Sequence, residues 1–122
     1  MAAKQKILIV DDERAIAHAL ELKLTHTGYD ATVVGDGELA LEALGKDTFN
    51  LMLLDLVMPK MDGFTVLAEM KKRKLTVPVI VSSNLSQEED IKRAKELGAK
   101  DYFIKSNTPL VQIVEKIQAF LK

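Results

Sequence analysis

The chain has 122 residues, a length typical of one domain that buries about two thirds of the surface of its unfolded chain. Apolar residues make up 48% and the formal net charge is -1, which excludes a general attraction to nucleic acid or anionic lipid. No apolar run approaches the ~18 residues of a membrane span, and the first residues lack a signal-peptide core. Cysteine is absent, which excludes disulfides and thiolate sites. We therefore expect a cytoplasmic protein without direct membrane or nucleic-acid contacts.

Short apolar runs alternate with amphipathic segments along the whole chain. The runs predict strands over residues 6–10, 30–34, 50–55, 77–81 and 100–105. Apolar residues at spacings of three and four predict helices from Asp11 to about Thr27, from Asp36 to Gly45, from Asp62 to the basic run at 71–74, from Ser86 to Gly98, and from Thr108 onward. Five strand-helix units with short connections predict an α/β fold with a parallel sheet and helices on both faces.

Capping signals mark the predicted helix ends. Glycines are expected just after three of the helices: Gly28, Gly45 and Gly98. Ser86 and Glu89 have the spacing of a capping box at the start of the fourth helix. Thr108 is expected to cap the fifth helix, with Pro109 at its first position.

Polar residues stand where the predicted strands end, namely Asp11, Asp12, Asp55, Ser82, Ser83 and Lys105. In parallel α/β sheets the binding site forms outside the carboxyl ends of the strands, so these residues are expected at one edge. Three carboxylates brought together repel unless a cation neutralises them, and Mg²⁺ is suited to such oxygen ligands. A lysine and a hydroxyl nearby complete a site for a tetrahedral anion. The combination predicts metal-assisted phosphoryl chemistry, with the carboxylate of Asp55 as nucleophile.

Four motifs together resemble the receiver domain of two-component response regulators. They are ILIVDDE at 7–13, LLDLVMPKMDG at 53–63, PVIVSS at 78–83 and GAKDYFIK at 98–105. The resemblance extends over residues 1–122 and implies a flavodoxin-like, doubly wound (βα)5 fold with strand order 2-1-3-4-5, the order of the chemotaxis receiver.

The resemblance also implies roles for the site residues. Asp55 would accept a phosphoryl group from a phosphohistidine of a sensor kinase or phosphotransfer protein, so the chain would be no enzyme beyond catalysing its own phosphorylation and dephosphorylation. The implied cofactor is Mg²⁺. Asp12 would bind it directly, Asp11 through water, and Val57 through its backbone carbonyl, with Asp55 as a further metal ligand.

Three further residues would transmit the signal. By resemblance, Lys105 pairs with the phosphoryl oxygens, and Ser83, rather than its neighbour Ser82, moves to hydrogen-bond the phosphoryl group. Tyr102 would follow this movement and reshape the face made by the fourth helix, fifth strand and fifth helix. That face would bind a downstream target protein, or a second copy in a weak homodimer of an otherwise monomeric chain.

Four positions depart from the family pattern. Ser106 stands where proline usually follows the lysine through a cis bond, so the loop is expected to be either trans and rearranged or strained cis, at a cost of ~2.5–4 kcal/mol. Asn84 replaces a usual alanine or glycine and is expected to narrow access to the phosphoryl group. Val57 and Leu85 are apolar where relatives often orient the attacking water. Slow hydrolysis and a long-lived phosphorylated state are therefore expected.

Alternative interpretations remain at this stage. Asp11 and Asp12 could merely cap the first helix, and Tyr102 could be a plain core residue. A flavin binder is disfavoured because the acidic run 11–13 would repel its phosphate, and an aspartyl-phosphatase is disfavoured because its Asp-x-Asp is Asp-x-Glu here. A receiver-like interaction module that acts without phosphorylation stays open because of Asn84 and Ser106.

The output of the chain is expected to be protein-protein contact, because 122 residues leave no room for an effector domain. The start at Met1 favours a stand-alone protein over a receiver cut from a larger regulator. The sequence identifies neither the kinase nor the target.

Overall fold

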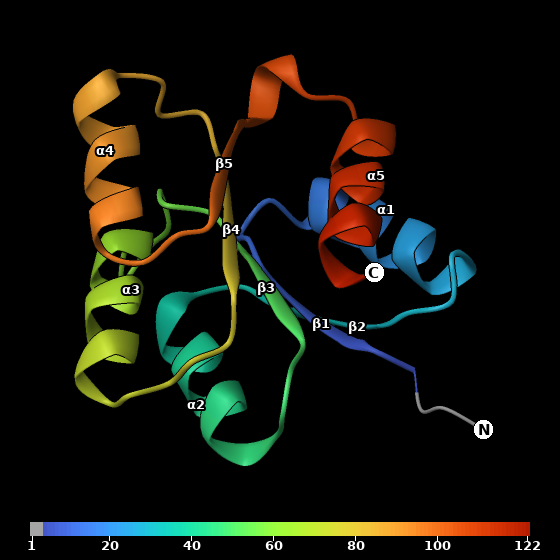
Figure 1. Ribbon diagram of the computed structural model, residues 1–122, viewed down its shortest axis with the longest axis horizontal. Coiled ribbons are helices and arrows are strands. Elements are labelled where there is room, and N and C mark those ends of the chain that lie inside the picture. The colour runs from blue at the N-terminus through green and yellow to red at the C-terminus, as the bar shows by residue number, and fades with distance from the viewer. Residues whose placement is uncertain (1–3) are drawn as a thin grey trace.

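Residues 4–122 are described by the computed structural model. Five parallel strands form one sheet in the order β2-β1-β3-β4-β5 (Figure 1). Their bounds are β1 Lys6–Val10, β2 Asp30–Val34, β3 Leu51–Leu54, β4 Val79–Ser83 and β5 Asp101–Ile104. The helices are α1 Arg14–His26, α2 Gly37–Lys46, α3 Gly63–Lys72, α4 Glu88–Glu96 and α5 Leu110–Leu121, with a 3-10 turn, η1, at Lys105–Asn107. The predicted α/β class and strand order are confirmed.

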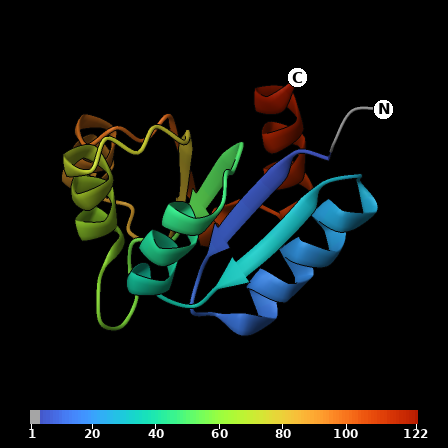
Figure 2. The ribbon, with the colours of Figure 1, turned by 90° about the horizontal axis from the view of Figure 1, so that it is seen from below.

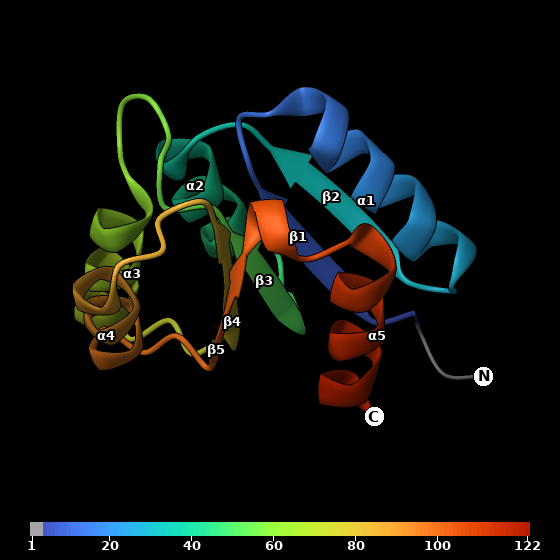
Figure 3. The ribbon, with the colours of Figure 1, turned by 90° about the horizontal axis from the view of Figure 1, so that it is seen from above.

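Helices cover both faces of the sheet. Helices α1 and α5 lie on one face and α2, α3 and α4 on the other, as the views from below and above also show (Figure 2, Figure 3). Two clusters of buried apolar side chains fill the spaces between the layers. In β1, Leu8 and Val10 point into the cluster beneath α2 to α4, whereas Ile7 and Ile9 point into the cluster beneath α1 and α5. Burial on both faces explains why the central strands are unbroken apolar runs.

Most predicted helix ends agree with the structure. Asp36 and Asp62 cap α2 and α3 by accepting hydrogen bonds from backbone N–H groups three residues on. Gly28 and Gly98 follow α1 and α4 with φ of 106° and 113°, values that glycine adopts readily. Gly45 was predicted wrongly as a helix end, because α2 runs on to Lys46.

Two of the predicted helix caps are wrong. Helix α4 begins at Glu88 behind Gln87 and makes no side-chain cap, so Ser86 forms no capping box; the acidic first turn favours the helix dipole instead. Pro109, not Thr108, is the residue before α5, and the Thr108 hydroxyl donates to the Ile104 carbonyl instead of capping the helix.

Strand β4 lies two residues later than predicted, because its pairing with β5 continues through the residues that follow its apolar run. The paired residues include Ser82 with Phe103 and Ser83 with Ile104.

The predicted start of the first helix is also wrong. Helix α1 begins at Arg14, directly after Glu13, so Asp11 and Asp12 lie before the helix and not in its first turn. Across residues 4–122, no helix combines the length and the apolar character needed to cross a membrane.

Candidate functional site

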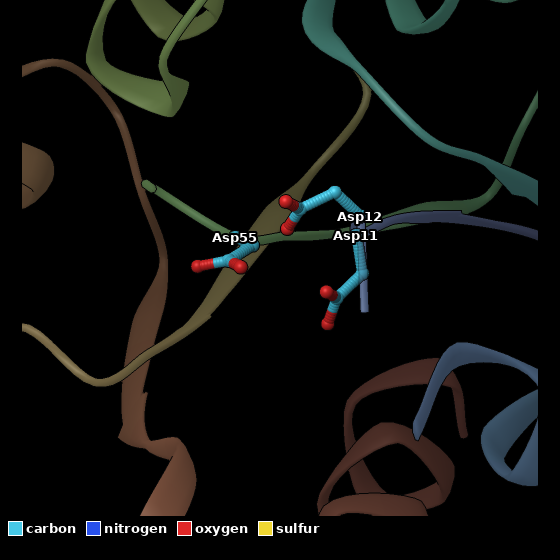
Figure 4. A group of neighbouring side chains, drawn as sticks. All are labelled: Asp11, Asp12 and Asp55. Atoms are coloured by element: carbon cyan, nitrogen blue, oxygen red, sulfur yellow. The ribbon is translucent and has the colours of Figure 1, made fainter. Parts of the chain in front are cut away.

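Three carboxylates meet at the carboxyl edge of the sheet. Asp11 and Asp12 follow β1, and Asp55 follows β3, the strand beside it. The pairing of Val10 with Leu54 brings the ends of these strands level, and the Asp55 N–H donates to the Val10 carbonyl at 2.9 Å. One carboxylate oxygen from each aspartate lies within 4.8 Å of the others (Figure 4). The predicted convergence of the three aspartates is confirmed.

Two of these carboxylates are buried. Asp11 and Asp55 are each 5% exposed, whereas Asp12 faces solvent. Burial raises the pKa of Asp11, and hydrogen bonds from Lys105 and from the Glu13 N–H oppose this rise only in part. The negative charge at Asp11 is therefore under-compensated, and a bound cation would stabilise it.

Lys105 is the cation of the site. Its Nζ lies 2.8 Å from Asp11 Oδ2, 2.9 Å from Glu13 Oε1 and 3.1 Å from Asp55 Oδ2. Burial of the ammonium lowers its pKa, but the hydrogen bonds to Asp11 and Glu13 and the nearby charges outweigh burial, so the pKa of Lys105 is raised. The ammonium stays charged at neutral pH. The site has one ammonium, that of Lys105, and four carboxylates, those of Asp11, Asp12, Glu13 and Asp55. The carboxylates therefore exceed the ammonium by three negative charges.

Glu13 is a site residue that the sequence reasoning missed. It was part of the acidic run after β1 but was given no role of its own, and the structure places it as the third carboxylate on Lys105. Glu13 lies two residues after Asp11, and in extended chain residues two apart point to the same side. This spacing could have indicated that both carboxylates contact the same cation.

The donor set fits a hard divalent cation. The converging ligands are carboxylate oxygens from Asp11, Asp12 and Asp55, without nitrogen or sulfur. Such oxygen sites suit Mg²⁺, which commonly keeps several waters and binds only one or two carboxylates. An open cavity of about 650 Å³ adjoins Asp11 and Asp12 between α1 and the start of α2, so water and small anions can reach this edge. The Val57 N–H donates to Asp55 Oδ1 at 3.2 Å, which orients the carboxylate.

The two serines lie at the end of β4 and are buried. The Ser83 Oγ accepts a hydrogen bond from the Leu85 N–H at 3.3 Å, so it is engaged with its own loop rather than with a site carboxylate. Ser83 is the last residue of β4 and directly precedes the β4–α4 loop.

Tyr102 connects β5 to the same loop. Its hydroxyl donates to the Leu85 carbonyl at 2.6 Å, and its ring packs against the cluster beneath α2 to α4. Burial raises the pKa of the phenol. Tyr102 is thus hydrogen-bonded to the loop that follows Ser83, whereas the hydroxyl of a plain core residue would lie at the surface.

The structure decides between the cis and trans alternatives expected for the peptide after Lys105. The Lys105–Ser106 peptide is trans, since the described residues contain no cis bond, and the chain turns through η1. The strained cis alternative is therefore wrong, and the trans peptide is confirmed. The Ser106 N–H donates to Asn84 Oδ1 at 2.9 Å, so two of the unusual positions contact each other.

Comparisons with known proteins agree with this geometry. The family model described as response regulator receiver domain matches residues 7–118. The probable transcriptional regulator ycf27 of Porphyridium aerugineum is 43% identical over 87% of this chain and 44% of its own length. The chain spans about half the length of the curated relatives it matches.

Solved receiver structures have the same fold. A CheY-like response regulator receiver domain protein from Methanospirillum hungatei JF-1 is 27% identical with a TM-score of 0.90, covering 98% of this chain and 94% of its own. The response regulator TrrA from Thermotoga maritima, determined in complex with Mg²⁺-BeF, is 29% identical with a TM-score of 0.82, covering 96% and 99%.

Proposed function

Because the chain belongs to the response regulator receiver domain family, we propose that it is the phosphoacceptor of a two-component phosphorelay. A receiver domain implies a histidine kinase as partner, and a phosphohistidine of that kinase or of a phosphotransfer protein would supply the phosphoryl group to Asp55. The observation that supports this most is the position of the Asp55 carboxylate, which lies beside two further aspartates and within 3.1 Å of Lys105 Nζ. In this function the chain promotes only its own phosphorylation and dephosphorylation.

We assign the metal ligands by role. Asp12 would bind Mg²⁺ directly, Asp11 through a water, and Val57 through its backbone carbonyl, with the Asp55 carboxylate as a further ligand. The all-oxygen donor set of this chain and the Mg²⁺-BeF complex of the Thermotoga maritima neighbour support a magnesium site. Bound Mg²⁺ would neutralise negative charge on the phosphoryl oxygens.

The chain's own groups account for the transfer. An Asp55 carboxylate oxygen attacks phosphorus, a P–O bond forms, and the P–N bond breaks with its electron pair left on the imidazole nitrogen. The Val57 N–H and Lys105 Nζ contact different oxygens of Asp55, Oδ1 and Oδ2, and so hold the carboxylate in place. The ammonium lies where it can pair with phosphoryl oxygens as charge builds up on them.

The response to phosphorylation would pass through Ser83 and Tyr102. Ser83, with Ser82 as the less favoured hydroxyl, would leave the Leu85 N–H to hydrogen-bond the phosphoryl group. Since Tyr102 donates to the Leu85 carbonyl, a shift of this loop would also move the aromatic ring. The face of α4, β5 and α5 would then change its affinity for a downstream target protein, or for a second copy in a weak homodimer.

This proposal also includes three expectations from the sequence. Residues 1–122 form one receiver domain, the protein is cytoplasmic, and it makes no direct contact with nucleic acid. The curated relatives are about twice as long as this chain.

The phosphorylated state is expected to be long-lived. Val57 is 56% exposed beside the site and, like Leu85, carries no polar group to orient water. Val57→Asn should accelerate loss of phosphate about tenfold in Mg²⁺, which corresponds to ~1.4 kcal/mol of barrier. Val111→Asn, at an exposed valine of α5, is the matched control and should leave the rate unchanged. Rapid loss of phosphate from the unmodified protein would contradict this expectation.

The proposed function is tested by intact mass after incubation with Mg²⁺ and acetyl phosphate. One added phosphoryl group is expected, and it should be absent without Mg²⁺ and in Asp55→Asn. If the unmodified protein gains no phosphoryl group under conditions that label another receiver, the phosphoacceptor function is wrong. The chain would then act as a receiver-like interaction module without phosphorylation.

A further inference from the structure

One hydrogen bond joins two loops that border the site. The Ser106 N–H in η1 donates to Asn84 Oδ1, in the β4–α4 loop, at 2.9 Å. Among the described residues, no other side-chain hydrogen bond joins residues 84–87 to residues 105–109. Both residues are exposed, so this bond adds little to the stability of the fold.

The bond acts on the peptide group of Lys105. The Ser106 N–H belongs to the planar unit that also contains the Lys105 carbonyl. That carbonyl accepts from the Thr108 N–H at 3.4 Å, so both ends of the unit are held, one by Asn84 and one by Thr108. The same planar unit contains the Lys105 Cα, so holding the unit restrains the point from which the Lys105 side chain starts.

The same bond also reaches the other side of the site. Asn84 directly follows Ser83, and Ser106 directly follows Lys105. Asn84 Oδ1 therefore connects the segment that carries the buried hydroxyl with the segment that carries the ammonium.

We propose that Asn84 is a positioning residue for phosphoryl transfer, because its side-chain carbonyl holds the Lys105 peptide and makes Ser83 and Lys105 move together. This inference rests on the proposed phosphoacceptor function. Small displacements of a positioned charge slow a reaction even when the fold is intact.

The first test compares Asn84→Leu with the unmodified protein. Leucine keeps the branched shape but offers no acceptor. With acetyl phosphate and Mg²⁺, the maximal rate of phosphorylation should fall roughly two- to tenfold, the range expected for one lost hydrogen bond. The half-saturating concentration of acetyl phosphate should change little, since the loss is in the transition state. Hydrogen exchange of the Ser106 amide, followed by NMR, should become faster.

The second test removes the donor. Proline at position 106 has no N–H, so Asn84 has no donor in a Ser106→Pro variant. The double variant Asn84→Leu/Ser106→Pro should therefore be phosphorylated at the same rate as Ser106→Pro alone, even if that rate differs from the rate of the unmodified protein. Ser106→Ala keeps the N–H and should behave as the unmodified protein. Circular dichroism and thermal unfolding check that each variant is folded.

The outcomes separate the two proposals. If the unmodified protein takes no phosphoryl group, the phosphoacceptor function is wrong and this inference fails with it. If it is phosphorylated but Asn84→Leu matches its rate, only the role of Asn84 is wrong. Equal slowing by Asn84→Leu in the serine and the proline backgrounds would also contradict that role, because the effect would then not pass through the Ser106 N–H.

Discussion

Replacing Lys105 with methionine is expected to lower the free energy of unfolding at neutral pH by about 3 kcal/mol, because it leaves buried carboxylates without their cation. The ammonium contacts Asp11 and Asp55, and both carboxylates are almost fully buried. Removing the hydrogen bond and the positive charge of Lys105 raises the pKa of Asp11 further, since both of these lower it in the unmodified protein. Urea unfolding at a series of pH values measures the effect.

The sign of the pH dependence follows from that pKa. A carboxyl group whose pKa is raised on folding opposes folding above the raised value, and the cost disappears as pH falls toward its ordinary pKa of 3.8. The difference in unfolding free energy between Lys105→Met and the unmodified protein should therefore be largest at neutral pH and shrink on acidification. Mg²⁺ should recover part of the loss at neutral pH, as a ligand that binds the folded state.

Lys116→Met is a suitable control for this variant. Lys116 is an exposed lysine of α5 that forms no ion pair within the described part of the chain, and its replacement should change stability by no more than about 0.5 kcal/mol. A loss at Lys105 that is equal at pH 4 and pH 7, or that matches the control, would contradict the assignment of Lys105 as the cation of a buried carboxylate cluster.

Gly63→Ala is expected to destabilise the protein by about 2–3 kcal/mol through overpacking. A Cβ at Gly63 would lie 2.5 Å from the Asp55 carbonyl oxygen and 2.7 Å from Leu56 Cα, both of which are backbone atoms. Relief of this clash has to shift the segment that carries Asp55, so phosphorylation by acetyl phosphate should slow as well. Urea unfolding and the phosphorylation rate are the two measurements.

Gly45→Ala is the matched control with the opposite expected sign. Gly45 lies inside α2, and a Cβ there would meet no heavy atom within 4 Å. Alanine should raise the unfolding free energy by roughly 0.5–1 kcal/mol, because glycine is the poorer helix former. If both substitutions changed stability in the same direction, the close approach of α3 to the Asp55 backbone would not be the cause of the Gly63 effect.

The sequence was sufficient to predict the strands and the acidic site, for a physical reason. Leu51–Leu54 are buried between the two helix layers, so their apolar run predicts the central strand, and a carboxylate that follows such a run lies at the carboxyl edge. Asp11 and Asp55 come together because their strands are paired neighbours.

The contacts between loops could not be predicted in the same way. Glu13 and Lys105 are 92 residues apart, and Asn84 and Ser106 are 22 apart. Each contact depends on the backbone path of a turn, which hydrophobic periodicity does not describe. The unusual residues Asn84 and Ser106 are visible in the sequence, but the hydrogen bond between them is visible only in the structure.

The most direct test of the phosphoacceptor assignment is to locate the phosphoryl group. Sodium borohydride reduces an aspartyl phosphate to homoserine, which peptide mass spectrometry assigns to one position. After incubation with Mg²⁺ and acetyl phosphate, homoserine is expected at Asp55 and at no other aspartate. A phosphorylated sample with Asp55 unreduced, or with homoserine at Asp12, would contradict the account.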